Sequence, residues 1–161
     1  MNIFHTSTCP YESAKAVCDV HANKMLTETV QMLCTSHQLN GTADSRTWQA
    51  GYVHHPMTKW VAETQGNYLW ALEHAHALKD EYYLRYGVKP HKSITMLENL
   101  PETNLRLPMS IPPQCMPDEY KNDDHTIGYR DYYIGEKLPK DWCGWVTVSY
   151  THLTLPTSLI V

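Results

Sequence analysis

The sequence predicts a mainly α protein: a compact single-domain bundle of about three main helices with a long proline-rich loop. Apolar residues recur at helical spacing through two long segments, 11–37 and 57–86. Neither an internal repeat nor a series of short alternating segments typical of β-strands is present. The 161 residues, 42% of them hydrophobic, are enough for one domain with a real core.

The first helix is expected from about Tyr11 to His37, after a short extended start at Asn2 to Phe4. Turn residues up to Pro10 precede this helix. Gly41 and the polar residues after it break the helical pattern, so the helix should end before them.

The second helix is expected from about Met57 to Tyr86. Pro56 suits the first turn of a helix, and Gly87 is a typical stop. Its apolar face carries Trp60, Ala71, Leu78 and Tyr82.

Six of the ten prolines lie between Lys89 and Asp124, which predicts a mostly irregular region with one short helix near Ser93 to Asn99. Such a long loop is often functional. Asp123 or Asp124 can cap a third helix, from about Thr126 to Lys137.

Composition narrows the class of protein. No apolar run approaches the roughly 20 residues that span a bilayer, and the N-terminus lacks a secretory signal, so we expect a cytoplasmic protein without a membrane partner. Five cysteines, an odd number, fit free thiols in a reducing compartment. The formal charge of −4 gives no electrostatic case for nucleic-acid binding. Eleven tyrosines and five tryptophans against one phenylalanine favour an aromatic-lined cleft or interface.

The C-terminal residues differ from the rest of the chain. From Val148 onward no charged residue occurs, and VSYTHLTLPTS looks like a translation of a sequencing-library adapter. We therefore expect one helical domain over 1–147 and a non-native tail over 148–161. The alternative is a genuine terminal strand.

Three ionisable side chains, His21, Lys24 and Glu28, share one face of the first expected helix, in the stretch CDVHANKMLTETVQML. At about 100° per residue, His21 and Glu28 differ by only about 20°, and Lys24 lies about 60° to one side. A lone buried carboxylate is costly unless it is paired, so one interpretation is a sheltered Lys24–Glu28 pair that positions catalytic groups. The other is a surface ion pair with His21 at the edge of the core.

Two Cys-x-x-His pairs, Cys18/His21 and Cys34/His37, resemble half-sites for zinc. In one continuous helix the two pairs would lie about 24 Å apart, beyond any common coordination shell. We therefore expect no metal site and no cofactor.

Two further patterns have alternative interpretations. On the second helix, one quarter of the circumference carries polar or bulky residues, which favours a solvated face or else a wall of a cleft: Glu63, Asn67, Trp70, His74, Glu81 and Arg85. In the third helix, rings alternate with cations, which suits stacking on bases with contact to phosphates, or simple packing in a core: Tyr129, Arg130, Tyr132, Tyr133 and Lys137.

These segments carry a resemblance to known proteins. The motif CDVHANKMLTE resembles the first-helix motif of the bacteriophage endonuclease V family, the pyrimidine-dimer DNA glycosylases, in which the catalytic Glu follows a His by seven positions. The segment YRDYYIGEK resembles that family's aromatic and basic C-terminal segment. To about Lys137 the chain is also similar to a group of uncharacterised phage proteins with a CDxHxxKMxxExxQxL helix, an HPxTxWxxExxxNYxW segment and an MPDEYK loop.

The resemblance implies a helical DNA glycosylase with lyase activity on damaged or modified bases. The α-amino group of the chain, here on Met1, would attack the sugar C1′ to form a Schiff base. Glu28 would stabilise the sugar cation and move protons, with His21 orienting it or the backbone. No metal is required. Asn2 and Thr27 depart from the family's pattern, and Lys24 is the alternative amine.

The partner implied is DNA or a nucleotide, bound by a monomer in the cytoplasm of a phage-infected host cell. Candidate contacts to it are His54, His55, Lys59, Asn67, Arg130, Tyr132, Tyr133 and Lys137. Two alternatives remain: an enzyme acting on nucleotides or other small molecules, and a noncatalytic protein that binds a host partner through its tyrosine-rich surface.

Overall fold

The computed structural model describes residues 1–145 of the chain, and in that part every regular element is helical. The elements are α1 (Pro10–Lys15), α2 (Asp19–Asn40), α3 (Pro56–Glu63), α4 (Gln65–Tyr86), α5 (Lys92–Leu97), the 3₁₀ turn η1 (Asp118–Tyr120), α6 (His125–Tyr132) and the π-helical turn η2 (Tyr133–Lys137). The predicted mainly α fold is confirmed. The expected adapter-derived tail lies outside the described residues.

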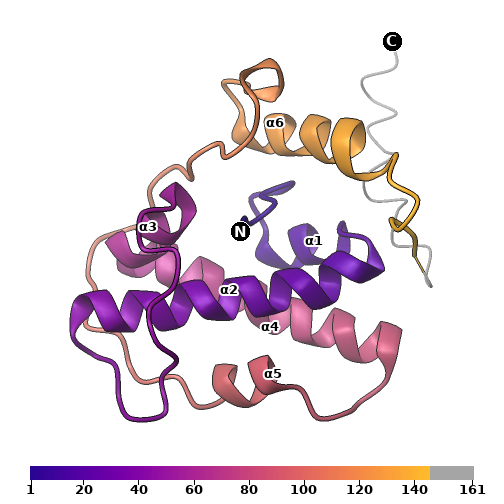
Figure 1. Cartoon of the computed structure of the whole chain (residues 1–161). Coiled ribbons are helices and arrows are strands. Elements are labelled where there is room, and N and C mark those ends of the chain that lie inside the picture. The colour runs from indigo at the N-terminus through magenta and orange to yellow at the C-terminus, as the bar shows by residue number, and fades with distance from the viewer. Residues whose placement is uncertain (146–161) are drawn as a thin grey trace.

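The two long helices α2 and α4 pack against each other and form the centre of the bundle. Helix α1 packs on α4, and α3 packs on both α2 and α4 (Figure 1). Helix α5 covers one side of this pair, and α6 lies on the other side. The N-terminal segment runs between α2 and α6, so the first residues of the chain lie inside the bundle.

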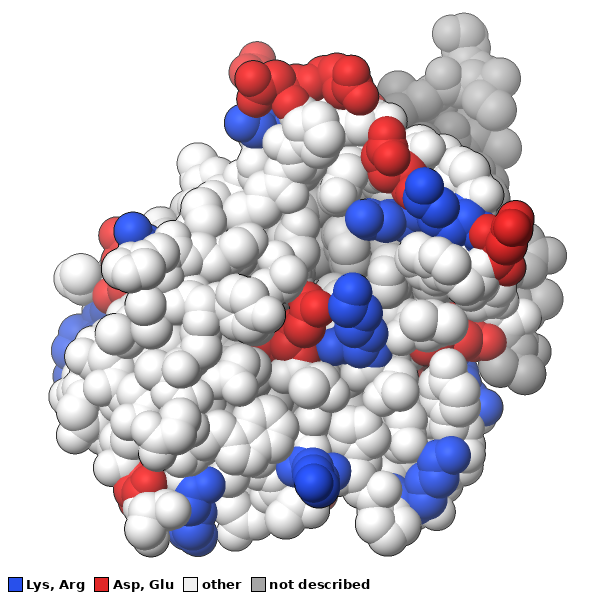
Figure 2. All heavy atoms as spheres, viewed as in Figure 1, with Lys and Arg blue, Asp and Glu red and all other residues white. Residues whose placement is uncertain are grey.

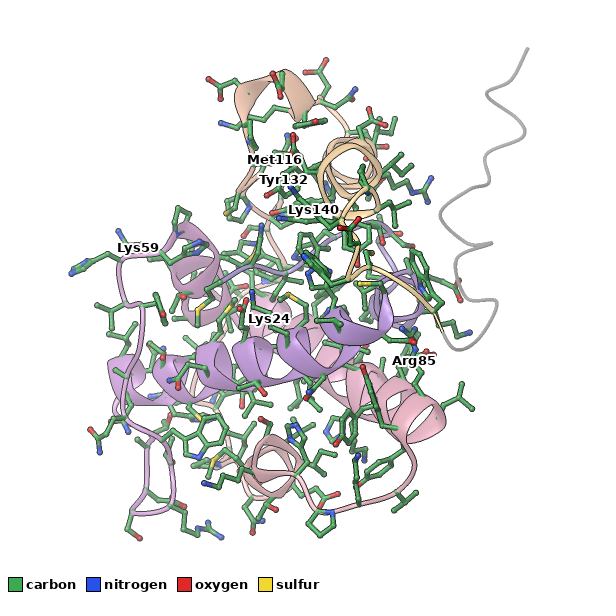
Figure 3. The ribbon with its side chains drawn as sticks, turned by 45° about the vertical axis from the view of Figure 1, so that its right-hand side comes forward. Lys24, Lys59, Arg85, Met116, Tyr132 and Lys140 are labelled. Atoms are coloured by element: carbon green, nitrogen blue, oxygen red, sulfur yellow. The ribbon has the colours of Figure 1, made fainter. Side chains whose placement is uncertain are left out.

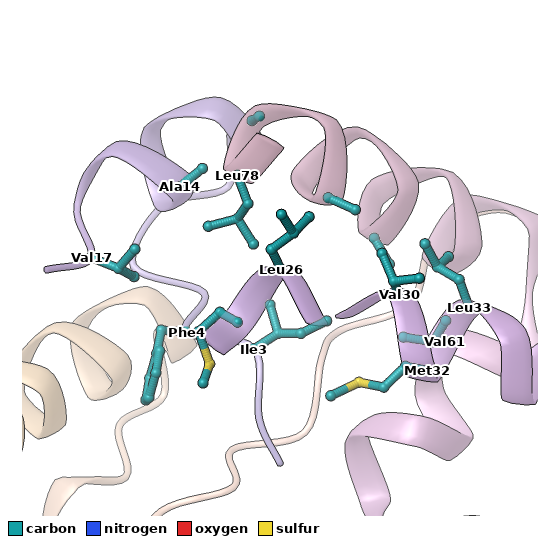
Figure 4. Close-up of a cluster of buried hydrophobic side chains, with 14 of the residues drawn as sticks. Ile3, Phe4, Ala14, Val17, Leu26, Val30, Met32, Leu33, Val61 and Leu78 are labelled. Carbon is teal, nitrogen blue, oxygen red and sulfur yellow. The ribbon is translucent and has the colours of Figure 1, made fainter. Parts of the chain in front are cut away.

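Burial of the N-terminal segment fixes the start of the chain. Ile3 is fully buried and Phe4 is 4% exposed. In the core, Ile3 lies between the chain start and the side chains of Leu26 and Leu78 (Figure 4). Burying one such side chain stabilises the folded state by about 1.5–3 kcal/mol. The packing of Ile3 and Phe4 therefore holds Met1 in position, in addition to the contacts that Met1 makes itself.

The helix predicted over 11–37 is wrong in one respect, because residues 16–18 interrupt it. At the interruption, tertiary hydrogen bonds replace helical ones. The Tyr133 hydroxyl accepts from the Cys18 N–H at 2.8 Å, and the Val17 carbonyl accepts from the Arg85 guanidinium at 2.6 Å. Cys18 is therefore the residue that precedes α2 and does not lie within the helix.

The helix predicted over 57–86 is likewise divided, at Thr64. This residue has extended backbone angles, φ −133° and ψ 158°, and its side chain caps α4 by accepting from the Asn67 N–H at 3.0 Å. The following N–H group of Gln65 donates to the Arg106 carbonyl at 2.9 Å. The segment that contains Arg106 and Met109 passes close to the backbone at this point. Gly66 permits this approach, because a Cβ there would collide with the backbone of Met109.

The solvated face expected on the second helix is wrong, because most of its residues are buried. Asn67 and His74 are 0% and 1% exposed, and Glu81 and Arg85 are 8% and 7% exposed. Arg85 donates to Glu81 Oε2 at 2.7 Å and to Asp19 Oδ1 at 3.2 Å, as well as to the Val17 carbonyl. Through these bonds the Arg85 guanidinium connects α4 to Val17 and Asp19, where the chain passes from α1 to α2.

The remaining helix predictions agree with the structure. Asp124 caps α6 by accepting from the Thr126 N–H at 2.9 Å, and the helical turns continue through η2 to Lys137. The short helix in the proline-rich region is α5. None of the helices between residues 1 and 145 combines the length and the apolar character that a membrane span requires.

A buried histidine lies in the aromatic part of the core. His5 is fully buried and stacks on Trp70 with ring centroids 4.0 Å apart, and neither of its ring nitrogens has a hydrogen-bond partner among the described residues. Burial lowers the pKa of His5 well below its ordinary value, and the neighbouring His74 and His125 lower it further. His5 is therefore neutral in the folded protein at pH 7.

Replacing Arg85 with alanine should lower the free energy of unfolding by about 3–5 kcal/mol, because Glu81 and Asp19 lose the cation that offsets their burial. Urea denaturation measures this change. The control is Arg46→Ala, which removes an exposed pair with Asp44 and should cost no more than about 1 kcal/mol. Equal effects of the two substitutions would contradict the role assigned to Arg85.

Stability should decline as the pH falls below about 6.5, since the unfolded chain then binds protons that His5 does not accept in the folded protein. Replacing His5 with phenylalanine keeps the stacked ring and removes the titration. Between pH 7.5 and pH 5.0 the variant should therefore lose about 2 kcal/mol less than the wild type. Parallel pH profiles of unfolding free energy would exclude a contribution from His5.

Candidate active site

A cavity of about 240 Å³ lies between α2, the N-terminal segment and the α6–η2 region. It brings together residues far apart in the chain, including the four expected catalytic residues. Its lining consists of Met1, Asn2, Phe4, His21, Lys24, Met25, Glu28, Cys115, Tyr132 and Lys137.

Glu28 is the acid of this cavity, and its side chain is 16% exposed. Oxygen Oε2 lies 3.7 Å from the α-amino nitrogen of Met1 and accepts from the Asn2 N–H at 3.0 Å. The second oxygen, Oε1, lies 3.8 Å from Lys24 Nζ. One carboxylate therefore faces two amines and one backbone donor.

The two residues that carry these cations differ in side-chain burial. The Met1 side chain is only 4% exposed and its sulfur accepts from the Thr58 hydroxyl at 3.6 Å, whereas the Lys24 side chain is 61% exposed. Of the two interpretations of the Lys24–Glu28 pair, a pair sheltered on both sides does not fit, because Lys24 is exposed while Glu28 is largely sheltered. The second cation beside Glu28 is the amine of Met1.

Asn2 fixes the direction in which the chain starts. Its side-chain Nδ2 donates to the Cys115 carbonyl at 2.9 Å, and its Oδ1 accepts from the Ile3 N–H at 2.9 Å. Because its backbone N–H is also bound to Glu28, the residue is held from three sides. The amine of Met1 is consequently oriented into the cavity.

His21 does not contact Glu28. Its Nδ1 lies 2.6 Å from the Tyr133 hydroxyl, which also accepts from the Cys18 N–H. Burial lowers the pKa of His21 to about 4, assisted by the nearby charges of Lys137 and Lys24, so the ring is neutral at pH 7. The roles expected for His21 are to orient either Glu28 or the backbone. The geometry fits the second role, at the start of α2.

Two cations and one ring lie around the mouth of the cavity. Lys137 Nζ lies 4.9 Å from the centroid of the Tyr132 ring. Lys24 projects from α2 on the side that faces Tyr132 (Figure 3). This arrangement places positive charge beside an aromatic face that can stack on a planar ligand.

Charge on this face of the molecule is sparse. In the space-filling view, acidic and basic side chains meet in a central hollow over α2, and further charges lie over the α6 region without forming a continuous basic track (Figure 2). A surface of this kind suits contact with a few phosphates more than with a long duplex.

The other expected binding residues are not in the cavity lining. His55 lies close to the cavity, and its Nδ1 caps α3 by accepting from the Met57 N–H. Burial lowers the pKa of His55, and the positive charge of the chain's amino terminus lowers it further. His54 is exposed, and Lys59 lies on the outer side of α3 (Figure 3).

Three expected binding residues serve the fold. The Asn67 amide nitrogen donates to the Trp60 carbonyl at 2.8 Å, and its oxygen accepts from the Ser110 N–H at 2.8 Å. Arg130 Nε donates to the Thr6 carbonyl at 2.7 Å. Tyr133 is fully buried behind His21. Of the aromatic and basic residues expected in the third helix, Tyr132 and Lys137 alone line the cavity.

Sequence reasoning missed the contributions of Asn2, Cys115 and Tyr52. A second cavity, of about 210 Å³, also borders Met1 and Glu28, and Tyr52 forms part of its lining. No periodic signal points to Cys115 or Tyr52, because both lie in irregular segments.

No group of three or more His, Cys, Asp or Glu residues within 1–145 is placed to hold a metal ion. The pair Cys34 and His37 is buried, and the His37 ring nitrogens contact Thr42 and Tyr68 hydroxyls at 2.7 Å each.

Comparisons of the chain with protein families, with curated proteins and with solved structures gave no match. The chemistry of the cavity therefore rests on its own geometry. An amine that lies next to a carboxylate in a cavity can attack an electrophilic carbon while the carboxylate accepts the proton.

Removing the Tyr133 hydroxyl should destabilise the site's framework. In Tyr133→Phe the Cys18 N–H and His21 Nδ1 lose their common buried partner, so the free energy of unfolding should fall by about 1–3 kcal/mol. The matched control is Tyr132→Phe, since the Tyr132 hydroxyl has no hydrogen bond within the described part of the chain. A control change as large as the Tyr133 change would contradict this framework role.

Proposed function

We propose that the protein is a DNA glycosylase with lyase activity that acts on damaged or modified bases through an amine Schiff base. One observation carries the proposal: the Met1 amine lies 3.7 Å from the Glu28 carboxylate, and both residues line the same cavity. Packing alone favours an apolar side chain at such a position, because an ionised group loses hydration there.

In the first step, the neutral amine attacks C1′ of the target nucleotide. The N–C1′ bond forms as the glycosidic bond breaks, and the base leaves with the bonding electron pair and takes a proton. Glu28 stabilises the positive charge that develops on the sugar and accepts the proton released by the attacking nitrogen. Glu28 then gives this proton to the ring oxygen O4′ as the C1′–O4′ bond breaks, which leaves a protonated Schiff base and regenerates the carboxylate.

In the second step, loss of a proton from C2′ breaks the C3′–O bond by β-elimination, and the phosphate leaves. Glu28 is the nearest base to a sugar bound on the Met1 nitrogen. Water then releases the protein from the cleaved strand. α-Amino groups suit this chemistry better than lysines because a larger fraction is neutral at pH 7.

The substrate is contacted through one nucleotide rather than along a duplex. The cavity, at about 240 Å³, is below the 300–1,000 Å³ typical of pockets for drug-sized ligands, so it admits a sugar with its phosphate. Lys24 and Lys137 supply the cations for that phosphate. The formal charge of −4 also argues against extensive binding to duplex DNA. As part of this proposal, the protein acts as a monomer in the cytoplasm of a phage-infected host cell.

Borohydride should trap a covalent adduct between the protein and an oligonucleotide that contains an abasic site. Peptide mass mapping should locate the adduct on the Met1 nitrogen. Glu28→Gln should lower the rate of strand cleavage at least 100-fold, because it removes the proton acceptor and keeps the side chain's shape.

The matched control is Lys24→Met, which removes the second amine and keeps the aliphatic stem. It should retain adduct formation, with weaker binding of the phosphate. An adduct on Lys24 would reassign the nucleophile. Absence of any adduct with damaged, abasic or modified DNA would exclude the proposed function.

A further inference from the structure

The amine–carboxylate pair of Met1 and Glu28 separates two cavities. The first, already described, is bordered by Lys24, Lys137 and Tyr132. The second, of about 210 Å³, is lined by Met1, Thr27, Glu28, Gln31 and Tyr52. It contains no lysine or arginine, so the two sides of the reacting pair differ in charge.

Tyr52 has a conformation that side chains rarely adopt. Its φ is +53°, in the left-handed region, although it is not a glycine. The residue is 69% exposed, and its carbonyl accepts from the His55 N–H at 3.0 Å. Its ring and hydroxyl make no hydrogen bond or ring contact among residues 1–145. Such a conformation is unfavourable for a residue other than glycine and persists only where the surroundings hold it.

Hydrogen bonds from α2 hold the loop that carries Tyr52. Gln31 Nε2 donates to the Gln49 carbonyl at 2.9 Å, and Gln38 Nε2 donates to the Trp48 carbonyl at 2.9 Å. The Thr35 hydroxyl accepts from the Gly51 N–H at 3.0 Å. Three side chains on successive turns of α2 thus fix the loop and leave the Tyr52 ring unpartnered at the mouth of the cavity.

We propose that this second cavity is a nucleobase subsite in which the Tyr52 ring stacks on the base of the target nucleotide. The orientation of the nucleotide in this subsite rests on the proposed function. The sugar then lies over the Met1 amine, the phosphate faces the lysines of the first cavity, and the glycosidic bond lies above the reacting pair.

The chemistry of the lining favours a base on this side. Beside the Met1–Glu28 pair itself, the lining supplies the exposed ring of Tyr52 and the uncharged polar side chains of Thr27 and Gln31. These match a planar, uncharged ligand, whereas a phosphate requires cations. Gln31 uses its amide nitrogen to hold the loop, so its amide plane forms a fixed wall of the subsite. Stacking is tolerant of base identity because every base has a π-face, so ordinary nucleotides are suitable probes.

The test is calorimetric titration of the full chain with each of the four 2′-deoxynucleoside 5′-monophosphates and with 1,2-dideoxyribose 5-phosphate. The last compound lacks a base and cannot form a Schiff base. At least one nucleotide should bind about 5-fold or more tightly than the compound without a base. Tyr52→Phe, which keeps the ring, should retain this preference.

Tyr52→Asn is the variant that removes the ring. Asparagine tolerates the left-handed backbone, so the loop keeps its conformation. The ratio of the affinity for the nucleotide to the affinity for the compound without a base should fall by about 5- to 100-fold, so that little or no preference remains. A wild-type protein without preference for the nucleotides, or a preference unchanged in Tyr52→Asn, overturns the subsite.

The calorimetric test of the subsite and the borohydride test of the proposed function can fail independently, because calorimetry measures binding and requires no reaction. An adduct with abasic DNA together with no base preference leaves the lyase chemistry in place and removes the subsite. A base preference that depends on Tyr52, together with no adduct, keeps the subsite and excludes the Schiff-base function.

Discussion

The Glu28 carboxylate holds the first two residues of the chain, and the rest of the site depends on this contact. One of its oxygens accepts from the Asn2 N–H and lies 3.7 Å from the Met1 amine. A sheltered carboxylate requires donors and positive charge in place of water. The start of the chain supplies both, so the same contact offsets the charge of Glu28 and positions the Met1 amine beside it.

The fold makes this contact possible by burying the N-terminal segment between α2 and α6. Ile3 fills the core, and the Phe4 ring packs against the rings of His21 and Tyr133 at centroid distances of 5.2 and 4.9 Å. Tyr133 in turn fixes the start of α2 through the Cys18 N–H. Stability and the arrangement of reactive groups therefore depend on many of the same residues.

Local signals in the sequence predicted much of the fold. Asp124 caps α6, Pro56 begins α3 and Gly41 ends α2 with a φ of +71°, because each residue determines backbone geometry at its own position. The breaks at Cys18 and Thr64 were not predictable. They arise from hydrogen bonds to Tyr133 and to the Arg106 segment, which lie far away in the chain.

The same distinction applies to the site. Helical spacing placed His21, Lys24 and Glu28 on one face, and all three line the cavity. Spacing could not show that the Met1 amine lies beside Glu28, since that depends on the anchoring of Asn2 to the Cys115 carbonyl. Nor could it show that His21 bonds Tyr133, or that Tyr52 lines a cavity together with Met1 and Glu28.

Hydrogen exchange of the Asn2 backbone amide, followed by NMR, tests the central contact most directly. The amide of a second residue normally exchanges rapidly, but here it is bound to a sheltered carboxylate. The account predicts slow exchange in the wild type and in Lys24→Met, and rapid exchange in Glu28→Ala. Exchange at the rate of an unstructured peptide in the wild type would contradict it.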